Sequence, residues 1–238
     1  MLKKLTNNVY YTEPEESTDR PAMGYVKGNK YSLMVEAGNS AKTVHKFNSS
    51  LSEMGFPKAD FAVVTHSHWD HTFGLHSLEA VSIALDKTND ILKFMETLTW
   101  SDSLLEKYVS EDIIPLFCKP HIINEYKDLS EIVVKPADIS FTDEMTLDLG
   151  NQKCIFKNIV SPHTDDCVIV YIPGENCVFL GDCLCEELVG DQWIDNKEKL
   201  AVLIETLENL DFEYGLEGHF APRKKEDILK DLKERLNL

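Results

Sequence analysis

The chain has 238 residues, enough to bury a large apolar core, and no Pro-, Gly- or Ser-rich linker divides it. Its 24 Lys and Arg residues against 41 Asp and Glu residues give a net charge of −17, a field that repels a phosphate backbone. We therefore expect one domain over residues 1–238 that does not bind nucleic acid. No apolar run approaches the length of a membrane span and no secretory signal is evident, so we expect no membrane partner and a cytoplasmic location.

Apolar periodicity predicts strands and helices in alternation through the first half of the chain. Residues 23–37 contain a tight turn at Gly28-Asn29, which is typical of two antiparallel strands. Ser40 is a favourable N-cap residue for the helix that follows. In chain order we predict strands over 7–12 and 23–37, a helix over 41–54, strands over 61–64 and 80–84, and helices over 87–99 and 101–109.

The segment 110–140 has no clear periodicity. Pro115, Pro120 and Pro136 interrupt any long helix there, so we expect irregular structure within a helical and irregular insert around 87–140. Such an insert can cover a cleft. Four ring side chains in it either contact a substrate or pack the insert against the domain: Trp100, Tyr108, Phe117 and His121.

Strand patterns return from about residue 144 onward, in pairs that flank short turns. We predict strands over 145–149, 154–159, 167–171 and 177–180, a helix over 196–209, a strand over 212–216 and a final helix over 224–236. Two strand-rich halves, each followed by helix, indicate an α/β fold. The specific prediction is a four-layer αβ/βα sandwich, in which two mixed sheets pack face to face with helices outside.

The densest group of metal-capable side chains lies at residues 66–71, His-Ser-His-Trp-Asp-His. The motif directly follows the apolar run 61–64, at the C-terminal end of a predicted strand, where α/β sheets place their ligand crevices. Four side chains within six positions are well suited to metal binding. They are His66, His68, Asp70 and His71.

Three residues further along the chain extend this group. His163, Asp182 and His219 each follow a predicted strand and stand beside Gly or Pro. Taken singly, each has an ordinary alternative as a helix-capping Asp or as a surface or core His. Loops at strand ends can bring residues that are distant in sequence to one sheet edge. Together with the motif at 66–71, these residues therefore predict a multi-ligand metal site.

The order and spacing of these residues resemble the metallo-β-lactamase superfamily. The resemblance rests on the strand and motif at 61–71, His163, Gly181-Asp182 and the Gly-His pair at 218–219, and it covers roughly residues 20–220. It is specific for the fold and the metal site. It does not identify a substrate, because the superfamily includes β-lactamases, thioester and lactone hydrolases, phosphodiesterases and some oxidoreductases on one scaffold.

The resemblance implies a centre with two divalent metal ions. Its ligands would be His66, His68 and His163 for one ion, Asp70, His71 and His219 for the other, and Asp182 as the bridge. Imidazoles and carboxylates suit Zn²⁺, with Fe or Mn as the other candidates. Two ions roughly 3.5–4 Å apart can share a water and lower its pKa toward about 7. We expect Asp70 also to orient the resulting hydroxide and to accept its proton, which is a catalytic role.

Two positions depart from the pattern of the family. The family commonly has Asp in the turn that closes the early strand, whereas this chain has Glu36, which either supports the metal-binding loop or is a plain surface acid. Some zinc β-lactamases use a Cys near position 183 as a metal ligand. Asp182 matches the hydrolase pattern in register, so we expect Cys183 to be a small buried residue. The six cysteines are expected to be reduced.

The leading interpretation is a metal-dependent hydrolase. A metal-bridging hydroxide would attack an ester, thioester, lactone or phosphodiester of a small-molecule substrate. An iron-dependent oxidoreductase resembling the sulfur dioxygenases is an alternative, since its ligands would be a subset of those present. The di-iron flavoprotein pattern is disfavoured, because it has Glu where this chain has His68. A non-catalytic, metal-stabilised binding domain is the third possibility. The sequence makes no prediction of the oligomeric state.

Overall fold

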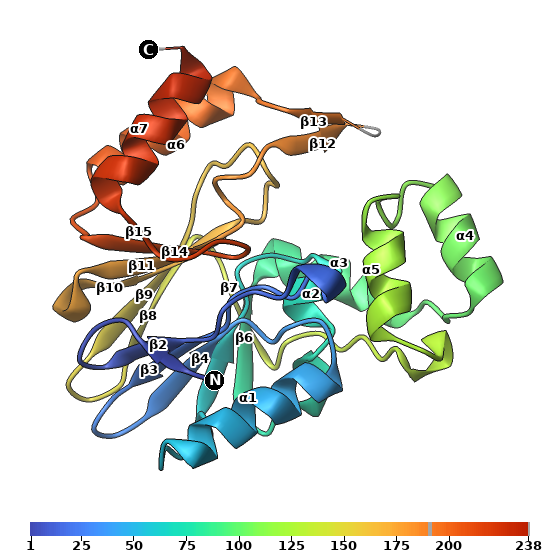
Figure 1. Ribbon diagram of the computed structural model, residues 1–238, viewed down its shortest axis with the longest axis horizontal. Coiled ribbons are helices and arrows are strands. Elements are labelled where there is room, and N and C mark those ends of the chain that lie inside the picture. Colours follow the sequence, from blue (N-terminus) through green and yellow to red (C-terminus); the bar gives the residue numbers. More distant parts are fainter. Residues whose placement is uncertain (190–191, 238) are drawn as a thin grey trace.

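Two mixed β-sheets pack face to face, and helices cover their outer faces, in a computed structural model that describes residues 1–189 and 192–237 (Figure 1). This is the α/β sandwich that the sequence predicts. Helix α1 covers the outer face of one sheet, and α6 and α7 cover the outer face of the other. The green helices at the right of Figure 1, α4 and α5, belong to the insert.

The first sheet has seven strands in sequence order. They are β1 (Lys3–Lys4), β2 (Val9–Tyr11), β3 (Gly24–Lys27), β4 (Ser32–Val35), β5 (Phe61–Val63), β6 (Val81–Leu85) and β7 (Ile139–Phe141). The first four strands pair antiparallel, and β4 to β7 pair parallel. The carboxyl ends of β4, β5 and β6 therefore lie at one edge of this sheet.

The second sheet has six strands in the order β15-β14-β11-β10-β9-β8. They are β8 (Glu144–Asp148), β9 (Lys153–Asn158), β10 (Val168–Ile172), β11 (Cys177–Gly181), β14 (Tyr214–Glu217) and β15 (Arg223–Lys224). Only β11 and β14 pair parallel, so these two strands end side by side. A separate hairpin, β12 (Glu187–Val189) with β13 (Gln192–Ile194), projects from the sandwich.

Within residues 1–189 and 192–237, seven α-helices connect or cover the strands. They are α1 (Ala41–Glu53), α2 (Trp69–Thr72), α3 (Asp86–Glu96), α4 (Asp102–Ser110), α5 (Cys118–Glu125), α6 (Lys197–Glu208) and α7 (Lys225–Leu236). None of the helices within the described residues combines the length and the apolar composition that a membrane span needs.

Alternating apolar residues explain the layers. In β4, Leu33 and Val35 point into the core between the sheets, whereas Met34 packs against α1. In β10, Val170 lies between the sheets and Ile169 packs under α6 and α7. Because successive side chains of a strand point to opposite faces, strands that are apolar at every position can supply both cores.

The sequence predicts irregular structure over 110–140. This prediction is wrong in part, because the segment contains the helix α5 and the strand β7. Pro120 is the third residue of α5, within the first turn, where a helix makes no use of the backbone N–H that proline lacks. Apolar residues of the insert, among them Trp100, Tyr108 and Ile122, share one buried cluster with residues of the sandwich such as Val64 and Phe73.

Candidate metal centre

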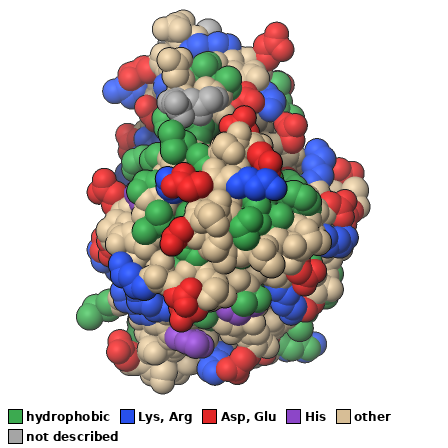
Figure 2. All heavy atoms as spheres, turned by 90° about the vertical axis from the view of Figure 1, so that its right-hand side faces the viewer, with side chains coloured by type: hydrophobic (Ala, Val, Ile, Leu, Met, Phe, Trp, Pro, Cys, Tyr) green, Lys and Arg blue, Asp and Glu red, His purple; other side chains and the backbone are tan. Residues whose placement is uncertain are grey.

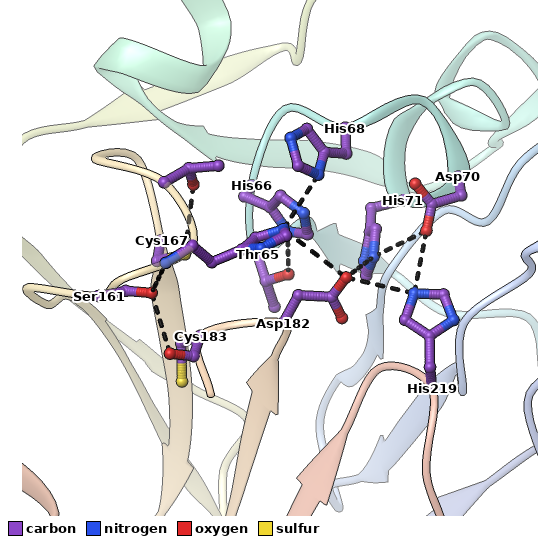
Figure 3. A network of polar contacts seen from close by, with 12 residues as sticks. Thr65, His66, His68, Asp70, His71, Ser161, Cys167, Asp182, Cys183 and His219 are labelled. Atoms are coloured by element: carbon purple, nitrogen blue, oxygen red, sulfur yellow. Dashed lines mark hydrogen bonds and ion pairs between the residues drawn. The ribbon is translucent and has the colours of Figure 1, made fainter. Parts of the chain in front are cut away.

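Five loops meet at one edge of the two sheets. Glu36 follows β4, the motif at 66–71 follows β5 and runs into α2, and His163 lies in the loop between β9 and β10. Asp182 follows β11, and His219 follows β14. The structure thus brings together all seven of the side chains predicted from sequence as metal ligands (Figure 3). Their role as ligands stays a prediction.

The first of two groups contains His66, His68 and His163, each of which offers a nitrogen within 4.8 Å of the others. The His163 Nε2 and His68 Nδ1 atoms lie 3.1 Å apart. The other His163 nitrogen, Nδ1, lies 3.1 Å from the carbonyl oxygen of Glu186. Because a carbonyl only accepts hydrogen bonds, the proton belongs on Nδ1, and the Nε2 lone pair faces the group.

The second group contains Asp70, His71, Asp182 and His219. Asp70 Oδ2 lies 3.0 Å from His71 Nε2 and 3.3 Å from His219 Nε2. Asp182 Oδ2 lies 3.4 Å and 3.2 Å from the same two nitrogens. The same Asp182 oxygen is 3.8 Å from His163 Nε2, so it stands between the two groups.

Burial favours neutral imidazoles in the first group. It lowers the pKa of His66 well below the usual value, with the neighbouring His71 and His68 acting in the same direction. It also lowers the pKa of His68 to about 4, again helped by a neighbouring histidine, His163. A neutral imidazole is the form that binds a metal ion.

Charge pairs dominate the second group. Burial opposes ionisation of Asp70, but His71 and His219 outweigh it and hold the pKa of Asp70 below its usual value. Likewise, burial opposes protonation of His219, but Asp182 and Asp70 raise its pKa to about 11. The carboxylates that hold a proton on His219 would attract a divalent cation for the same electrostatic reason.

The donor atoms of this centre fit a divalent metal ion. His66 Nε2, His71 Nε2 and Asp182 Oδ1 are buried without a hydrogen-bond partner. Leaving such atoms unpaired costs about 1–3 kcal/mol each. They belong to a set of seven donor side chains that converges from four loops, after β5, β9, β11 and β14. The chemistry of the set, imidazole nitrogen with carboxylate oxygen, is that of divalent metal sites in proteins.

Glu36 supports both groups. Its Oε1 atom accepts a hydrogen bond from Thr65 Oγ1 at 2.6 Å and lies 3.1 Å from His71 Nδ1. Thr65 Oγ1 in turn lies 3.1 Å from His66 Nδ1. Since the threonine proton is given to Glu36, its oxygen is free to accept the proton of His66 Nδ1. Through Thr65, the Glu36 carboxylate thereby directs the Nε2 atom of His66 toward the centre, and the same carboxylate faces Nδ1 of His71.

Two further polar residues hold the loops in place. Asp166 Oδ2 accepts hydrogen bonds from the Ser67 backbone N–H and from Thr88 Oγ1, both at 2.9 Å. Ser161 Oγ accepts from the backbone N–H of His163 at 3.0 Å and donates to the carbonyl oxygen of Cys183 at 2.9 Å (Figure 3). The loops that carry the two groups are thus tied to each other by short, buried contacts.

Glycines precede two of the predicted ligands because side chains do not fit there. A Cβ at Gly218 would stand 2.1 Å from Asp182 Oδ1. A Cβ at Gly181, whose φ is 50°, would stand 2.3 Å from Thr65 Oγ1. The β11 and β14 loops can approach the motif only with glycine at these positions.

Cys183 packs in the core beneath α6 and α7 and is fully buried. Burial raises the pKa of its thiol well above the usual value. A protonated thiol in an apolar cluster is a poor metal ligand, and among the described residues Cys183 belongs to neither group. All six cysteines are free thiols.

The four ring side chains of the insert divide between packing and the mouth of the centre. Trp100 and Tyr108 are buried in the cluster that packs the insert against the domain. Phe117 is 45% exposed, and its ring lies 5.1 Å from that of His121, measured between centroids. Trp193, on β13, stacks against the His163 ring with 6.5 Å between centroids and 11° between planes.

Sequence reasoning missed Trp193, Asp166 and Asp19. Asp166 contacts a residue 99 positions away, and Trp193 lies on a hairpin with no alternating apolar pattern to reveal it. Asp19 Oδ1 lies 3.7 Å from His219 Nδ1. For Asp166 the sequence offers one signal, its place three positions after the predicted ligand His163.

The fold and the site define a class of protein with His and Asp groups that fit a divalent metal site at the edge of an αβ/βα sandwich. Residues 21–219 match the family description "Metallo-beta-lactamase superfamily", which covers most of the chain. The chain belongs to this superfamily. A search of curated proteins finds no match.

Solved structures agree on the fold. A metallo-beta-lactamase from Pontibacter korlensis is 15% identical, with a TM-score of 0.70 over 100% of this chain and 98% of that one. A metallo-beta-lactamase from Hirschia baltica is 13% identical, with a TM-score of 0.63 over 98% and 96%. A stereoselective inverting sec-alkylsulfatase from Pseudomonas sp. is 15% identical, with a TM-score of 0.69 over 99% of this chain but 41% of that one.

Proposed function

We propose that the chain is a metal-dependent hydrolase that cleaves an ester, thioester, lactone or phosphodiester of a small substrate. The observation that carries this proposal is the pair of adjacent His and Asp groups with Asp182 between them. Each group offers buried donor atoms without hydrogen-bond partners. Membership of a superfamily whose members are mostly hydrolytic enzymes supports the same reaction class.

The residues of the centre would have different roles in the reaction. Bound divalent ions would supply a water of lowered pKa and would stabilise charge on the attacking and leaving oxygens. In our proposal Asp70 orients the attacking water and accepts its proton, a general-base role that is compatible with metal ligation. Asp182 joins the two groups through a single carboxylate oxygen. Glu36 keeps the rings of His66 and His71 in the required tautomer.

We propose Zn²⁺ as the resident ion, in two copies, because neutral imidazoles and carboxylates are typical zinc ligands. His66, His68 and His163 would hold one ion. Asp70, His71 and His219 would hold the other, with Asp182 shared. We further propose that the protein works in the cytoplasm, where its six free thiols would remain reduced.

The test combines metal analysis with a substrate panel. The purified protein is measured by emission spectroscopy and then assayed with esters, thioesters, lactones and phosphodiesters after addition of Zn²⁺ or Mn²⁺. We expect close to two divalent ions per chain and turnover on at least one class. A fully loaded protein that turns over none of them contradicts the proposal, and iron alone at one ion per chain favours the oxidoreductase.

The variant Asp70→Asn separates catalysis from folding. It keeps the shape of the side chain and removes the proton acceptor, so we expect a loss of kcat on the order of 10²–10⁴-fold. Asp227→Asn is the matched control, because Asp227 is exposed in the first turn of α7. Metal content is measured for both variants, so that loss of an ion is recognised as such.

A further inference from the structure

Two aromatic side chains from different elements meet over the first histidine group. Trp193 comes from the β12–β13 hairpin, and Phe117 immediately precedes α5 in the insert. Their rings lie 5.6 Å apart between centroids, nearly perpendicular at 83°. Trp193 also stacks on His163. The contact therefore joins the two elements that flank the centre, directly above a predicted metal ligand.

These two rings are exposed, whereas two other tryptophans of the chain are buried. Trp193 and Phe117 are each 45% exposed, whereas Trp69 and Trp100 are 3% and 7% exposed. Leu116 is another exposed apolar residue beside them. The face that carries the insert shows hydrophobic side chains, in green, among the charged ones (Figure 2). Exposed apolar groups that gather at the mouth of a polar site are typical of ligand binding.

The charges around the centre disfavour an anionic substrate. Among the described residues, no Lys or Arg pairs with Asp19, Asp70 or Asp182, whose partners are histidines. The whole chain carries −17, so a phosphate or carboxylate group on the substrate would meet repulsion at long range. Bound ions would offset the acidic residues only at the centre itself.

We propose that Trp193 and Phe117 form an aromatic clamp that binds the apolar group of the substrate. The substrate would then be an uncharged carboxylic ester, thioester or lactone with an aromatic or extended aliphatic group. This inference rests on the proposed hydrolase function and narrows its substrate class. The exposed parts of the two aromatic rings provide the apolar contact surface.

The first experiment compares two thioesters of 2-hydroxyethanethiol, one with an acetyl and one with a phenylacetyl group. Both release the same uncharged thiol. We expect Trp193→Ala to raise KM for the phenylacetyl thioester about tenfold, which corresponds to about 1.4 kcal/mol, with kcat within about twofold. Trp193→Phe should recover most of the loss. The acetyl thioester should respond little to either change.

The matched control is Ile194→Ala on the same strand. Ile194 is 44% exposed, but it points to the opposite face of the hairpin from Trp193, because side chains alternate along a strand. It should leave both KM values unchanged. Metal content is measured for every variant, since Trp193 contacts His163. If Trp193→Ala impairs both thioesters equally at full metal content, the clamp is wrong.

The second experiment needs no turnover. Trp193 is the only one of the three tryptophans that is substantially exposed, so quenching of fluorescence by acrylamide reports mainly on it. We expect N-ethylphenylacetamide, which resists hydrolysis, to protect this tryptophan, and N-ethylacetamide not to. Protection without hydrolysis of any substrate would retain the clamp and reject the hydrolase. Hydrolysis without protection or acyl preference would reject the clamp alone.

Discussion

The carboxylate of Glu36 shows how one residue can organise the centre. Its backbone φ is 70°, in the left-handed region that residues other than Gly rarely adopt. The side chain is buried and contacts Thr65 and His71. Strained conformations of this kind persist at functional sites where the surroundings fix them. Of the two roles that the sequence left open for Glu36, the structure favours support of the metal-binding loop.

We predict that Glu36→Gln weakens metal binding by about 10–100-fold, because the amide keeps the size but loses the charge that orients His71. Competition with a chromophoric chelator measures the affinity. Glu53→Gln, at the exposed end of α1, is the control and should bind metal like the unaltered protein. Equal affinity in the Glu36 variant would show that the carboxylate is not needed for the centre.

At the scale of elements, Asp166 links three parts of the chain. It lies in the loop between β9 and β10, and its carboxylate accepts hydrogen bonds from the motif loop and from α3. The remaining oxygen accepts from Thr164 Oγ1 at 2.7 Å. The position of the first histidine group therefore depends on an interaction that neither the motif nor the strands provide.

We predict that Asp166→Ala lowers the free energy of unfolding by about 3 kcal/mol, because it leaves buried donors without an acceptor. Urea denaturation measures the change. Asp165→Ala is a control of the same type from the next position, where the side chain is 77% exposed and pairs with Lys199 on the surface. It should cost less than about 1 kcal/mol. Similar costs for both variants would refute the linking role.

The junction of β6 and β7 carries a pH-dependent contact. The Asp138 carboxylate accepts from the backbone N–H and the hydroxyl of Ser82, at 2.9 Å and 2.7 Å. These bonds and Lys135 lower the pKa of Asp138 from 3.8 to about 2. A lowered pKa in the folded state means that the stabilisation is complete above the unfolded value and is lost as the pH falls through the folded value.

Accordingly, the difference in unfolding free energy between the unaltered protein and Asp138→Asn should be largest above pH 5 and should shrink between about pH 4 and pH 2. Thermal or urea unfolding at a series of pH values measures it. Because both proteins share all other carboxylates, the difference isolates Asp138. A difference that stays constant or grows on acidification would contradict the assignment.

Elements with strong local signals were predictable from sequence. Short apolar runs bounded by turn residues identified the central strands of both sheets, and Ser40 marked the start of α1, where its side chain accepts from the Thr43 N–H. Helix α5 was not predicted, because the prolines at 115, 120 and 136 exclude only a long helix, and a short helix can carry Pro120 in its first turn. The hairpin was missed because β13 has no buried face, so its pattern has no period of two.

The candidate site likewise has a part that sequence predicts and a part that it does not. The motif at 66–71 is local, and the three later residues were recognisable by their place after strands. The contacts that orient the predicted ligands and that line the access to them could not be recognised from sequence. They join residues far apart in the chain, such as Asp166 with Ser67 or Trp193 with Phe117. Substrate preference depends on these long-range contacts, which is why the motif alone could not predict it.

At the scale of the whole molecule, the centre joins the two sheets at their common edge. Donors come from loops of both sheets, so a bound ion cross-links the sandwich. An ion that binds only the folded chain stabilises it by mass action, by about 4.1 kcal/mol at a thousandfold excess over Kd. For a chain of this size, that raises Tm by roughly 8–16 °C.

Calorimetry before and after Zn²⁺ is restored to chelator-treated protein tests this expectation. His66→Ala should remove much of the rise, because it deletes a buried donor of the first group. His45→Ala is a suitable control, since His45 is an exposed residue of α1. A Tm that does not respond to metal would mean that the folded chain does not bind it.

The most direct test of the central claim is a metal titration of the chelator-treated protein, followed by its rate of thioester hydrolysis. We predict that the rate rises with added Zn²⁺ and reaches its plateau at two equivalents per chain. It should stay near the background in Asp70→Asn over the same range. Two bound equivalents with no rate above background, or equal rates in the presence of excess chelator, would contradict a metal-dependent hydrolase.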